Sequence, residues 1–149
     1  MTVTHRLSHT RAYNSWLSMR RRCDVPTADN YSRYGALGIT YCSSWSDFEQ
    51  FYEDMGECPL GKTLDRRDGT KNYSKENCRW ADATEQVLNR KTPKHNTTGR
   101  KGVHWHKAAK KWFARGTKYK VIYELYYGDS YEEAVAAREK WEIANGVTN

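Results

Sequence analysis

The sequence predicts an α+β protein: an N-terminal helical region with a strand–loop–strand–helix unit, then a small sheet with one helix. Three observations support this class. Only 38% of the 149 residues are hydrophobic and the mean hydropathy is −1.00, which is too polar for one thick core. Six Trp and eleven Tyr supply large rings that can hold thin modules together. The polar stretch TPKHNTTG divides the chain, so we predict modules at residues 1–90 and 100–149 joined by a linker at 91–99.

The first expected element is an amphipathic helix with a basic end. Aromatic and apolar side chains recur at intervals of three and four residues, at Tyr13, Trp16, Met19 and Cys23. Three arginines at residues 20–22 lie near its end, and Pro26 stops it. The next residues, DNYSRYGALGIT, are rich in turn formers, and we expect Gly35 and Gly38 to occupy tight bends.

A second helix is predicted in SSWSDFEQFYEDMG. Ser44 is the expected N-cap, with Asp47 three residues later, and Gly56 is the expected end. The side chains expected on its buried face are Trp45, Phe48, Phe51, Tyr52 and Met55. Those expected on its solvent face are Glu49, Glu53 and Asp54.

Residues 62–91 predict a strand, a loop, a second strand and a helix, in that order. KTLDRR and NCRW have the character of short strands, and DGTKN between them is a turn. DATEQVLNRK has helical character, and Asp82 or Thr84 can cap its start.

The stretch after the linker predicts three short strands and a final helix. The strand residues are Val103, Trp105 and Lys107 in the first, Trp112 and Ala114 in the second, and Ile122 and Leu125 in the third. Ser130 and Glu133 form a capping box for the helix, and Gly146 ends it. Its packed face is expected to carry Tyr131, Ala134, Val135, Arg138 and Trp141.

Charge and hydropathy narrow the class of partner. The net charge is +7 and the pI is about 9.2, which favours a polyanion such as nucleic acid. No apolar run approaches the roughly 20 residues of a membrane span, and the N-terminus lacks the apolar core of a signal peptide. We therefore expect an intracellular protein with reduced thiols and no membrane partner.

The four cysteines leave two interpretations open. They are Cys23, Cys42, Cys58 and Cys78, and no Cys-x-x-Cys pair is present. If the fold brings them together, they can hold a structural Zn²⁺. If it does not, they are small buried apolar residues.

The second module resembles the apetala-two/ethylene-response-factor DNA-binding domain. The matching residues are Gly102, Val103, Trp105, Trp112, Ala114, Glu133 and Ala134. The resemblance implies a three-stranded antiparallel sheet packed on one helix, with the sheet in the major groove of double-stranded DNA. Either Trp105 or Trp112 can contact DNA or pack on the helix.

The basic residues of this module agree with a DNA partner, because no Asp or Glu interrupts them between Arg100 and Lys120. Arginine and lysine on such a sheet can reach guanine edges. The strand histidines, His104 and His106, would face the DNA rather than a metal. The predicted DNA-binding residues are Arg100, Lys101, His104, His106, Lys110, Lys111, Arg115, Lys118 and Lys120.

The first module resembles the HNH, or His-Me finger, nucleases of phages and mobile elements. The stretch LDRRDGTKNYSKENCRWADATEQVLNR carries the resemblance, with YNSWLSMRRRC and CPLG as flanking pieces. The family implies a ββα finger that holds one divalent cation, Mg²⁺ with Mn²⁺ as a substitute. On that template Asp65 is the metal ligand from the first strand and Asn77 braces the loop. Gln86 is the helix ligand, and Asn89 is the alternative for that role.

The chain departs from the family at the general base. The family has a histidine directly after the aspartate, whereas this chain has Arg66. Guanidinium cannot accept a proton at neutral pH, but it can clamp the scissile phosphate and stabilise its charge. The base must then come from elsewhere. The candidates are Tyr34, Tyr41, Tyr73, His9 or a metal-bound water.

Together these features predict a homing-type, site-specific endonuclease that hydrolyses double-stranded DNA, as a monomer or a homodimer. The second module would read the sequence, because each base contact adds only about 1–3 kcal/mol of discrimination. An alternative is a catalytically inactive DNA-binding or regulatory protein on a nuclease scaffold. Arg66 supports this alternative, because it replaces the histidine that serves as the general base in the family. A third is an RNA-binding module rich in stacking tyrosines.

Overall fold

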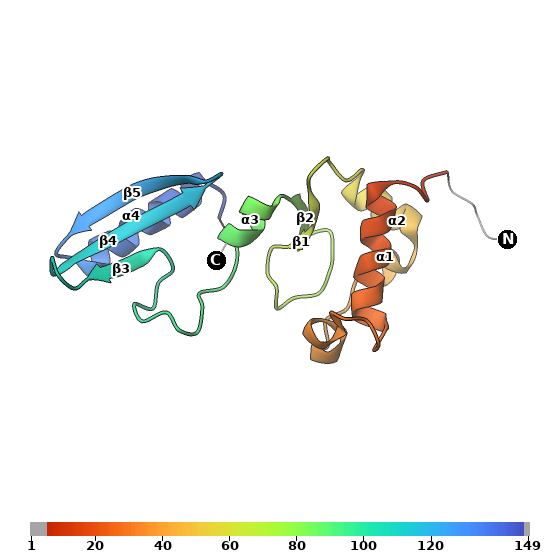
Figure 1. Ribbon diagram of the computed structural model, residues 1–149. Coiled ribbons are helices and arrows are strands. Elements are labelled where there is room, and N and C mark those ends of the chain that lie inside the picture. The colour runs from red at the N-terminus through yellow and green to blue at the C-terminus, as the bar shows by residue number, and fades with distance from the viewer. Residues whose placement is uncertain (1–5, 148–149) are drawn as a thin grey trace. The chain divides into compact units, whose positions relative to one another are not determined.

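The computed structural model describes residues 6–147 and has an α+β fold, as predicted. Figure 1 follows the chain from its first helix to its last. The chain forms two compact units, Met1–Ala83 and Thr84–Asn149. None of the helices in the described part of the chain is long and apolar enough to cross a bilayer.

Helices dominate the start of the first unit. α1 covers Arg11–Asp24 and α2 covers Phe48–Met55. Three short 3-10 helices lie between them, η1 at Tyr31–Arg33, η2 at Gly35–Leu37 and η3 at Ser43–Ser46. The first predicted helix is confirmed. Gly38 has the positive φ of 78° that its predicted bend requires.

The second helix begins later than expected, so the prediction of Ser44 as N-cap was wrong. The η3 turn comes first, and Asp47 then caps α2 by accepting a hydrogen bond from the Glu49 backbone N–H. Asp54 was also misplaced on the solvent face. Its Oδ2 accepts a 2.8 Å hydrogen bond from Trp45 Nε1, because a buried indole N–H needs an acceptor.

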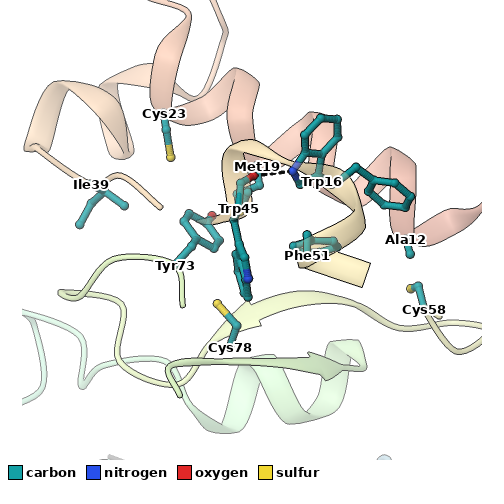
Figure 2. Close-up of a cluster of buried hydrophobic side chains, with 11 residues drawn as sticks. Ala12, Trp16, Met19, Cys23, Ile39, Trp45, Phe51, Cys58, Tyr73 and Cys78 are labelled. Atoms are coloured by element: carbon teal, nitrogen blue, oxygen red, sulfur yellow. Dashed lines mark hydrogen bonds between the residues drawn. The ribbon is translucent and has the colours of Figure 1, made fainter. Parts of the chain in front are cut away.

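A single cluster of buried side chains holds the first unit together (Figure 2). Its largest fully buried members are aromatic, and Trp16 of α1 donates a 2.7 Å hydrogen bond from Nε1 to the Trp45 carbonyl. Rings dominate this core, as the composition predicts. The buried members are Ala12, Trp16, Met19, Cys23, Ile39, Trp45, Phe48, Phe51, Cys58, Tyr73 and Cys78.

The predicted strand–loop–strand–helix order is confirmed. β1 covers Thr63–Arg66, β2 covers Cys78–Ala81 and α3 covers Ala83–Leu88. β1 and β2 pair antiparallel, with Asp65 opposite Arg79. The intervening residues 67–77 form a loop, which we call the finger loop. It is fastened to the helical region where Cys42 N–H donates to Tyr73 O at 2.9 Å.

The second unit contains the predicted three-stranded antiparallel sheet and its helix. β3 covers Val103–His106, β4 covers Lys111–Lys118 and β5 covers Val121–Gly128, in the order β3-β4-β5. α4 covers Tyr131–Ala144 and lies along one face of the sheet (Figure 1). The predicted N-cap is confirmed, because Ser130 Oγ accepts from the Glu133 N–H at 3.2 Å. The other half of the predicted capping box does not form, because the Ser130 N–H donates to the Tyr126 hydroxyl oxygen and that hydroxyl donates to the Glu133 carboxylate.

Alternation along the strands gives this sheet two different faces. Val103 and Ala114 are cross-strand partners, and both are buried against Ala134 of α4. The next pair, His104 and Phe113, therefore points to the opposite face, which we call the outer face. Trp112 packs on the helix side, with its ring centroid 4.8 Å from that of Tyr131, whereas Trp105 is 42% exposed.

The predicted linker at 91–99 has no helix or strand, but hydrogen bonds fix its C-terminal end to the second unit. Thr98 Oγ1 donates to the Val103 carbonyl at 2.7 Å, and Tyr131 of α4 donates from its hydroxyl to the Thr98 carbonyl at 2.7 Å. The division into compact units falls between Ala83 and Thr84, so α3 and the linker belong with the second unit.

Candidate functional site

Asp65, the predicted metal ligand, lies in β1 as a half-buried carboxylate beside an arginine. Its Oδ2 accepts a hydrogen bond from Arg79 Nε at 3.4 Å, and the two side chains are 20% and 15% exposed. Within the described residues, Arg79 Nη2 is buried without a hydrogen-bond partner. The cross-strand register places the pair together. A partly buried pair of this kind is screened by salt much less than a surface pair.

Asn77 braces the finger loop as the sequence predicts. Its side-chain nitrogen donates to the carbonyls of Asp68 and Asn72 at 3.1 and 2.9 Å, and its Oδ1 accepts from the Asp68 N–H at 3.0 Å. Its backbone carbonyl also accepts from the Arg67 N–H at 2.7 Å. One buried amide thus satisfies backbone groups on both sides of the loop, which fixes the loop beside β1.

Arg66 lies where the resembled family has its histidine, and it is anchored by aromatic rings. Its guanidinium carbon is 5.0 Å from the ring centroid of Tyr34 and 4.9 Å from that of Tyr73. Its Nη1 donates a 2.7 Å hydrogen bond to the carbonyl of Lys71 in the finger loop. These contacts fix the arginine and the loop together. The phosphate-clamping role of Arg66 stays a prediction.

Two of the candidate general bases hold their protons too firmly for that role. Tyr73 is 2% exposed, and burial raises its pKa to about 12. Tyr41 donates its hydroxyl hydrogen to Asp24 Oδ2 at 2.6 Å, and burial together with this bond raises its pKa. Both are therefore neutral donors near pH 7. Tyr34, the exposed His9 and a metal-bound water stay as predictions.

The expected partners of Asp65 in metal binding lie on or just after α3. Gln86 is within α3 and Asn89 follows its end, and both belong to the second compact unit. The described residues hold no group of three or more His, Cys, Asp or Glu side chains placed for a metal. The predicted site has one carboxylate, from Asp65, and one amide, so it would not count as a group of this kind. These oxygen donors suit Mg²⁺, which commonly binds through one or two carboxylates with phosphate and water.

Among the described residues, the four cysteines do not belong to any group of three or more metal-ligating side chains. All are free thiols, and Cys23, Cys58 and Cys78 are buried at separate places in the aromatic core (Figure 2). Cys58 Sγ donates to the Lys62 carbonyl at 3.1 Å, and Cys42 Sγ lies 3.5 Å from a serine hydroxyl. The zinc prediction is therefore not supported by their placement. The buried-thiol interpretation holds for three of the four.

In the second unit, two residues predicted to bind DNA instead have their charged groups held inside the unit. Arg100 Nη2 lies 2.6 Å from a carboxylate oxygen of Glu142. Lys101 Nζ donates to the carbonyls of Val87, Leu88 and Arg90 at 2.8, 2.9 and 3.1 Å. Burial and the nearby positive charge of Arg138 lower the pKa of Lys101. The Lys101 ammonium is thus satisfied within the unit, whereas among the described residues Arg100 Nε is buried without a hydrogen-bond partner.

Two further predicted cations lie at the margins of the sheet. Lys111 Nζ is 2.6 Å from an Asp129 carboxylate oxygen, and Lys118 Nζ donates to Asn145 Oδ1 at 3.3 Å. Both partners are exposed or partly exposed, so phosphate can replace them at little cost. The turn lysines at positions 110 and 120 are exposed, with φ of 52° and 65°.

The outer face carries the rest of the predicted DNA-binding set. His104 stacks on Phe113 with ring centroids 5.0 Å apart, and His106 meets the same ring edge-on at 6.5 Å. The Arg115 guanidinium carbon lies 4.8 Å from the Phe113 ring centroid, and its Nη2 is 3.8 Å from Glu124. Burial and the charge of Arg115 lower the pKa of His104.

Sequence reasoning missed three residues that organise these sites. Arg79 was not assigned to the site, although it is the partner of Asp65. Phe113 and Tyr127 were not assigned to the outer face, where they are directly paired across β4 and β5. Strict period-2 alternation from the buried Ala114 would have placed Phe113 opposite the helix.

Comparison with known proteins gives a partial likeness to a phage protein. Protein 3.8 of Escherichia phage T7 is 43% identical over 63 residues, which are 42% of this chain and 50% of that protein. The chain thus spans about half the length of this curated relative. No family model matches the sequence, and no solved structure matches it. Because the name of the phage protein states no activity, the likeness assigns none.

Proposed function

We propose that the chain is a metal-dependent, site-specific DNA endonuclease whose second unit binds double-stranded DNA. The observation that carries the proposal is the setting of Asp65, a half-buried carboxylate on β1 next to a loop that Asn77 braces from both sides. A carboxylate oxygen that is fixed in place is a ligand that a hard cation prefers. The partial likeness to a phage protein agrees with the HNH resemblance but does not test it.

The residues of the finger divide the work in this proposal. Asp65 would hold the cation, which supplies polarisation of the scissile phosphate and stabilisation of the leaving oxygen. Arg79 orients the Asp65 carboxylate through their 3.4 Å contact. Asn77 holds the finger loop in place beside Asp65 and β1. Gln86, with Asn89 as its alternative, remains the helix ligand that the resemblance implies.

The second unit would supply affinity and the choice of site. Its basic residues release counterions when they meet phosphates, so binding should weaken steeply as salt rises. A separate reader is useful to an enzyme that cuts at rare sites, because a small catalytic finger makes few base contacts. A monomer with one such finger would nick one strand, and a homodimer could cut both.

The second candidate is a DNA-binding protein that does not cut. Two observations favour it. Arg66 cannot act as the general base, and it is anchored to two tyrosine rings and a loop carbonyl. The ion pair of Asp65 with Arg79 also stabilises the finger by itself, so the carboxylate has a structural use without a metal.

A cleavage assay with matched variants separates the two candidates. Supercoiled plasmids carrying a library of random-sequence inserts are incubated with the full chain and Mg²⁺, Mn²⁺ or EDTA. The nuclease proposal predicts nicked or linear product with either metal and none with EDTA. Asp65→Asn should reduce the rate by at least about a hundredfold.

Asp68→Asn is the control for that experiment. It also converts an acid into an amide in the finger, but Asp68 mainly accepts hydrogen bonds from Thr70 within the turn, and an asparagine oxygen can accept the same bonds. This variant should keep its activity. Binding of DNA without cleavage in any divalent metal would favour the second candidate.

A further inference from the structure

The outer face of the second sheet is built mainly from rings rather than from hydrogen-bond donors. Phe113 and Tyr127 are cross-strand partners, and Tyr127 is 63% exposed. Together with His106, Arg115 and Glu124, they line an open hollow on this face. Tyr126 and Leu125 contribute to the hollow from the same strand. A planar, partly exposed surface of this kind suits another planar group.

Phe113 lies at the centre of this surface. Its ring contacts two histidines and the guanidinium of Arg115, so it is already held by planar neighbours. Tyr127 lies directly across the strand pair and projects further into solvent. The Phe113 ring forms the floor of the hollow, and the exposed Tyr127 ring presents an edge and a face to solvent. Aromatic side chains arranged in this way stack on nucleobases without regard to sequence.

At the centre of the outer face few charged groups are free to read base edges, so readout of duplex sequence would rest on the cations at the margins of the sheet. Among the predicted cations, Lys111 and Lys118 belong to the margins, and Arg100 and Lys101 are held inside the unit. Arg115 is on the outer face, but it lies against a ring and near Glu124. Bidentate readout of guanine in a groove needs several projecting donors. Stacking groups are better represented here than such donors.

We infer that the outer face binds an unpaired base of a single-stranded DNA segment, stacked on Tyr127 and Phe113. The inference rests on the proposed function, because it takes DNA as the ligand. It deepens that function by naming the substrate class as DNA with a gap, flap or loop. Unstacking a base from intact duplex costs a few kcal/mol, so an already unpaired base binds more readily.

Charge complementarity supports a nucleic-acid strand as the occupant. The chain has no acidic residue from Arg100 to Lys120, and the exposed Lys107, Lys110 and Lys120 lie in or beside the strand-connecting turns. A strand whose base stacks on the rings would carry its phosphates toward such cations. The acid on the face, Glu124, is paired with Arg115 at 3.8 Å and leaves the surroundings basic.

The test uses the full chain without divalent metal, so that no cleavage occurs. A short duplex with a central single-stranded gap carries one 2-aminopurine in the gap, and the intact duplex of the same sequence carries it at the same position. Fluorescence anisotropy gives the dissociation constants, and quenching of 2-aminopurine reports stacking. The wild-type chain should bind the gapped DNA about tenfold more tightly and quench its probe.

Variants at exposed tyrosines separate stacking from general affinity. Tyr127→Leu should abolish the preference for gapped DNA and the quenching, whereas Tyr127→Phe should keep both. Tyr119→Leu is the matched control, because Tyr119 is 59% exposed but lies in the β4–β5 turn. It should leave the preference unchanged.

The possible failures are distinguishable. Equal affinity for the two DNAs, or wild-type behaviour of Tyr127→Leu, would overturn the inference and leave duplex binding intact. Tighter binding of an RNA strand of the same sequence would overturn the choice of DNA. Absence of binding to either DNA would overturn the inference and the proposed function together.

Discussion

A single amide, that of Asn77, organises the finger loop at the scale of one residue. Its three side-chain hydrogen bonds join it to Asp68 and Asn72, and the residue is 9% exposed. Aspartate has the same length, but when ionised it is an acceptor only and cannot supply the two donated bonds. The same residue therefore serves the fold whether or not the finger cuts DNA.

Replacing Asn77 with alanine should destabilise the first unit by about 3 kcal/mol, because it leaves buried backbone groups unsatisfied. The measurement is the free energy of unfolding from a urea titration of the full chain. Glu76→Ala, at the exposed neighbouring position, should change it by less than about 0.5 kcal/mol. Equal effects of the two substitutions would contradict the bracing role.

The buried thiols should be chemically inert in the folded chain. Burial raises the pKa of Cys23 to about 11 and that of Cys78 to about 12, so neither is a thiolate at pH 8. Cys42 is less buried. Iodoacetamide at pH 8 should therefore alkylate Cys42 first, as peptide mass spectrometry would show. Faster labelling of Cys78 than of Cys42 would contradict this placement.

His104 should make the second unit sensitive to acid. Its pKa is lowered from 6.5 by burial and by nearby arginine charges, so the folded unit binds a proton less readily than the unfolded chain does. Stability should therefore fall as pH drops below about 6.5. His104→Gln should flatten the pH dependence of the melting temperature between pH 7.5 and 5. His95→Gln, in the exposed linker, should not.

At the scale of elements, Lys101 acts as a cap for the end of α3. A cation that donates to the last carbonyls of a helix satisfies groups that have no partner within the helix. It also fastens residues 87–90 to the segment just before β3, within the second unit. α3, which the sequence predicted to be part of the first module, is thus held by a residue of the second unit.

Lys101→Met should loosen α3, because methionine keeps an apolar stem but has no donors. Hydrogen exchange of the peptide covering residues 83–91, followed by mass spectrometry, should become about tenfold faster. Lys94→Met, in the exposed linker, should leave that exchange unchanged. Unchanged exchange in Lys101→Met would show that α3 does not depend on this contact.

Most elements could be predicted because local signals agree with their packing. Helical spacing located α1, strand alternation located β3, and the Ser130 cap located α4. The start of α2 was misplaced because two residues, Ser44 and Asp47, are both good caps, and only packing of Trp45 through the η3 turn decides between them. Tertiary context, not propensity, sets that boundary.

At the scale of the whole molecule, the sequence predicted the contacts of the candidate site only where the contacting residues are close together in the chain. The bracing by Asn77 was expected from the family resemblance, and it joins residues that are near in the sequence. The pairing of Asp65 with Arg79 depends on strand register, and the engagement of Arg100 by Glu142 depends on contacts across 42 residues. The sequence records the charges but not their partners, so it overstated the number of cations available to DNA.

The most direct test of the central claim is sequencing of the ends left when the full chain acts on random-sequence DNA. With Mg²⁺, the account predicts ends gathered at one recognisable sequence, with few in EDTA or with Asp65→Asn. Such clustering requires both a cutting finger and a reading module. Ends no more frequent with Mg²⁺ than with EDTA, or unchanged in Asp65→Asn, would contradict the account.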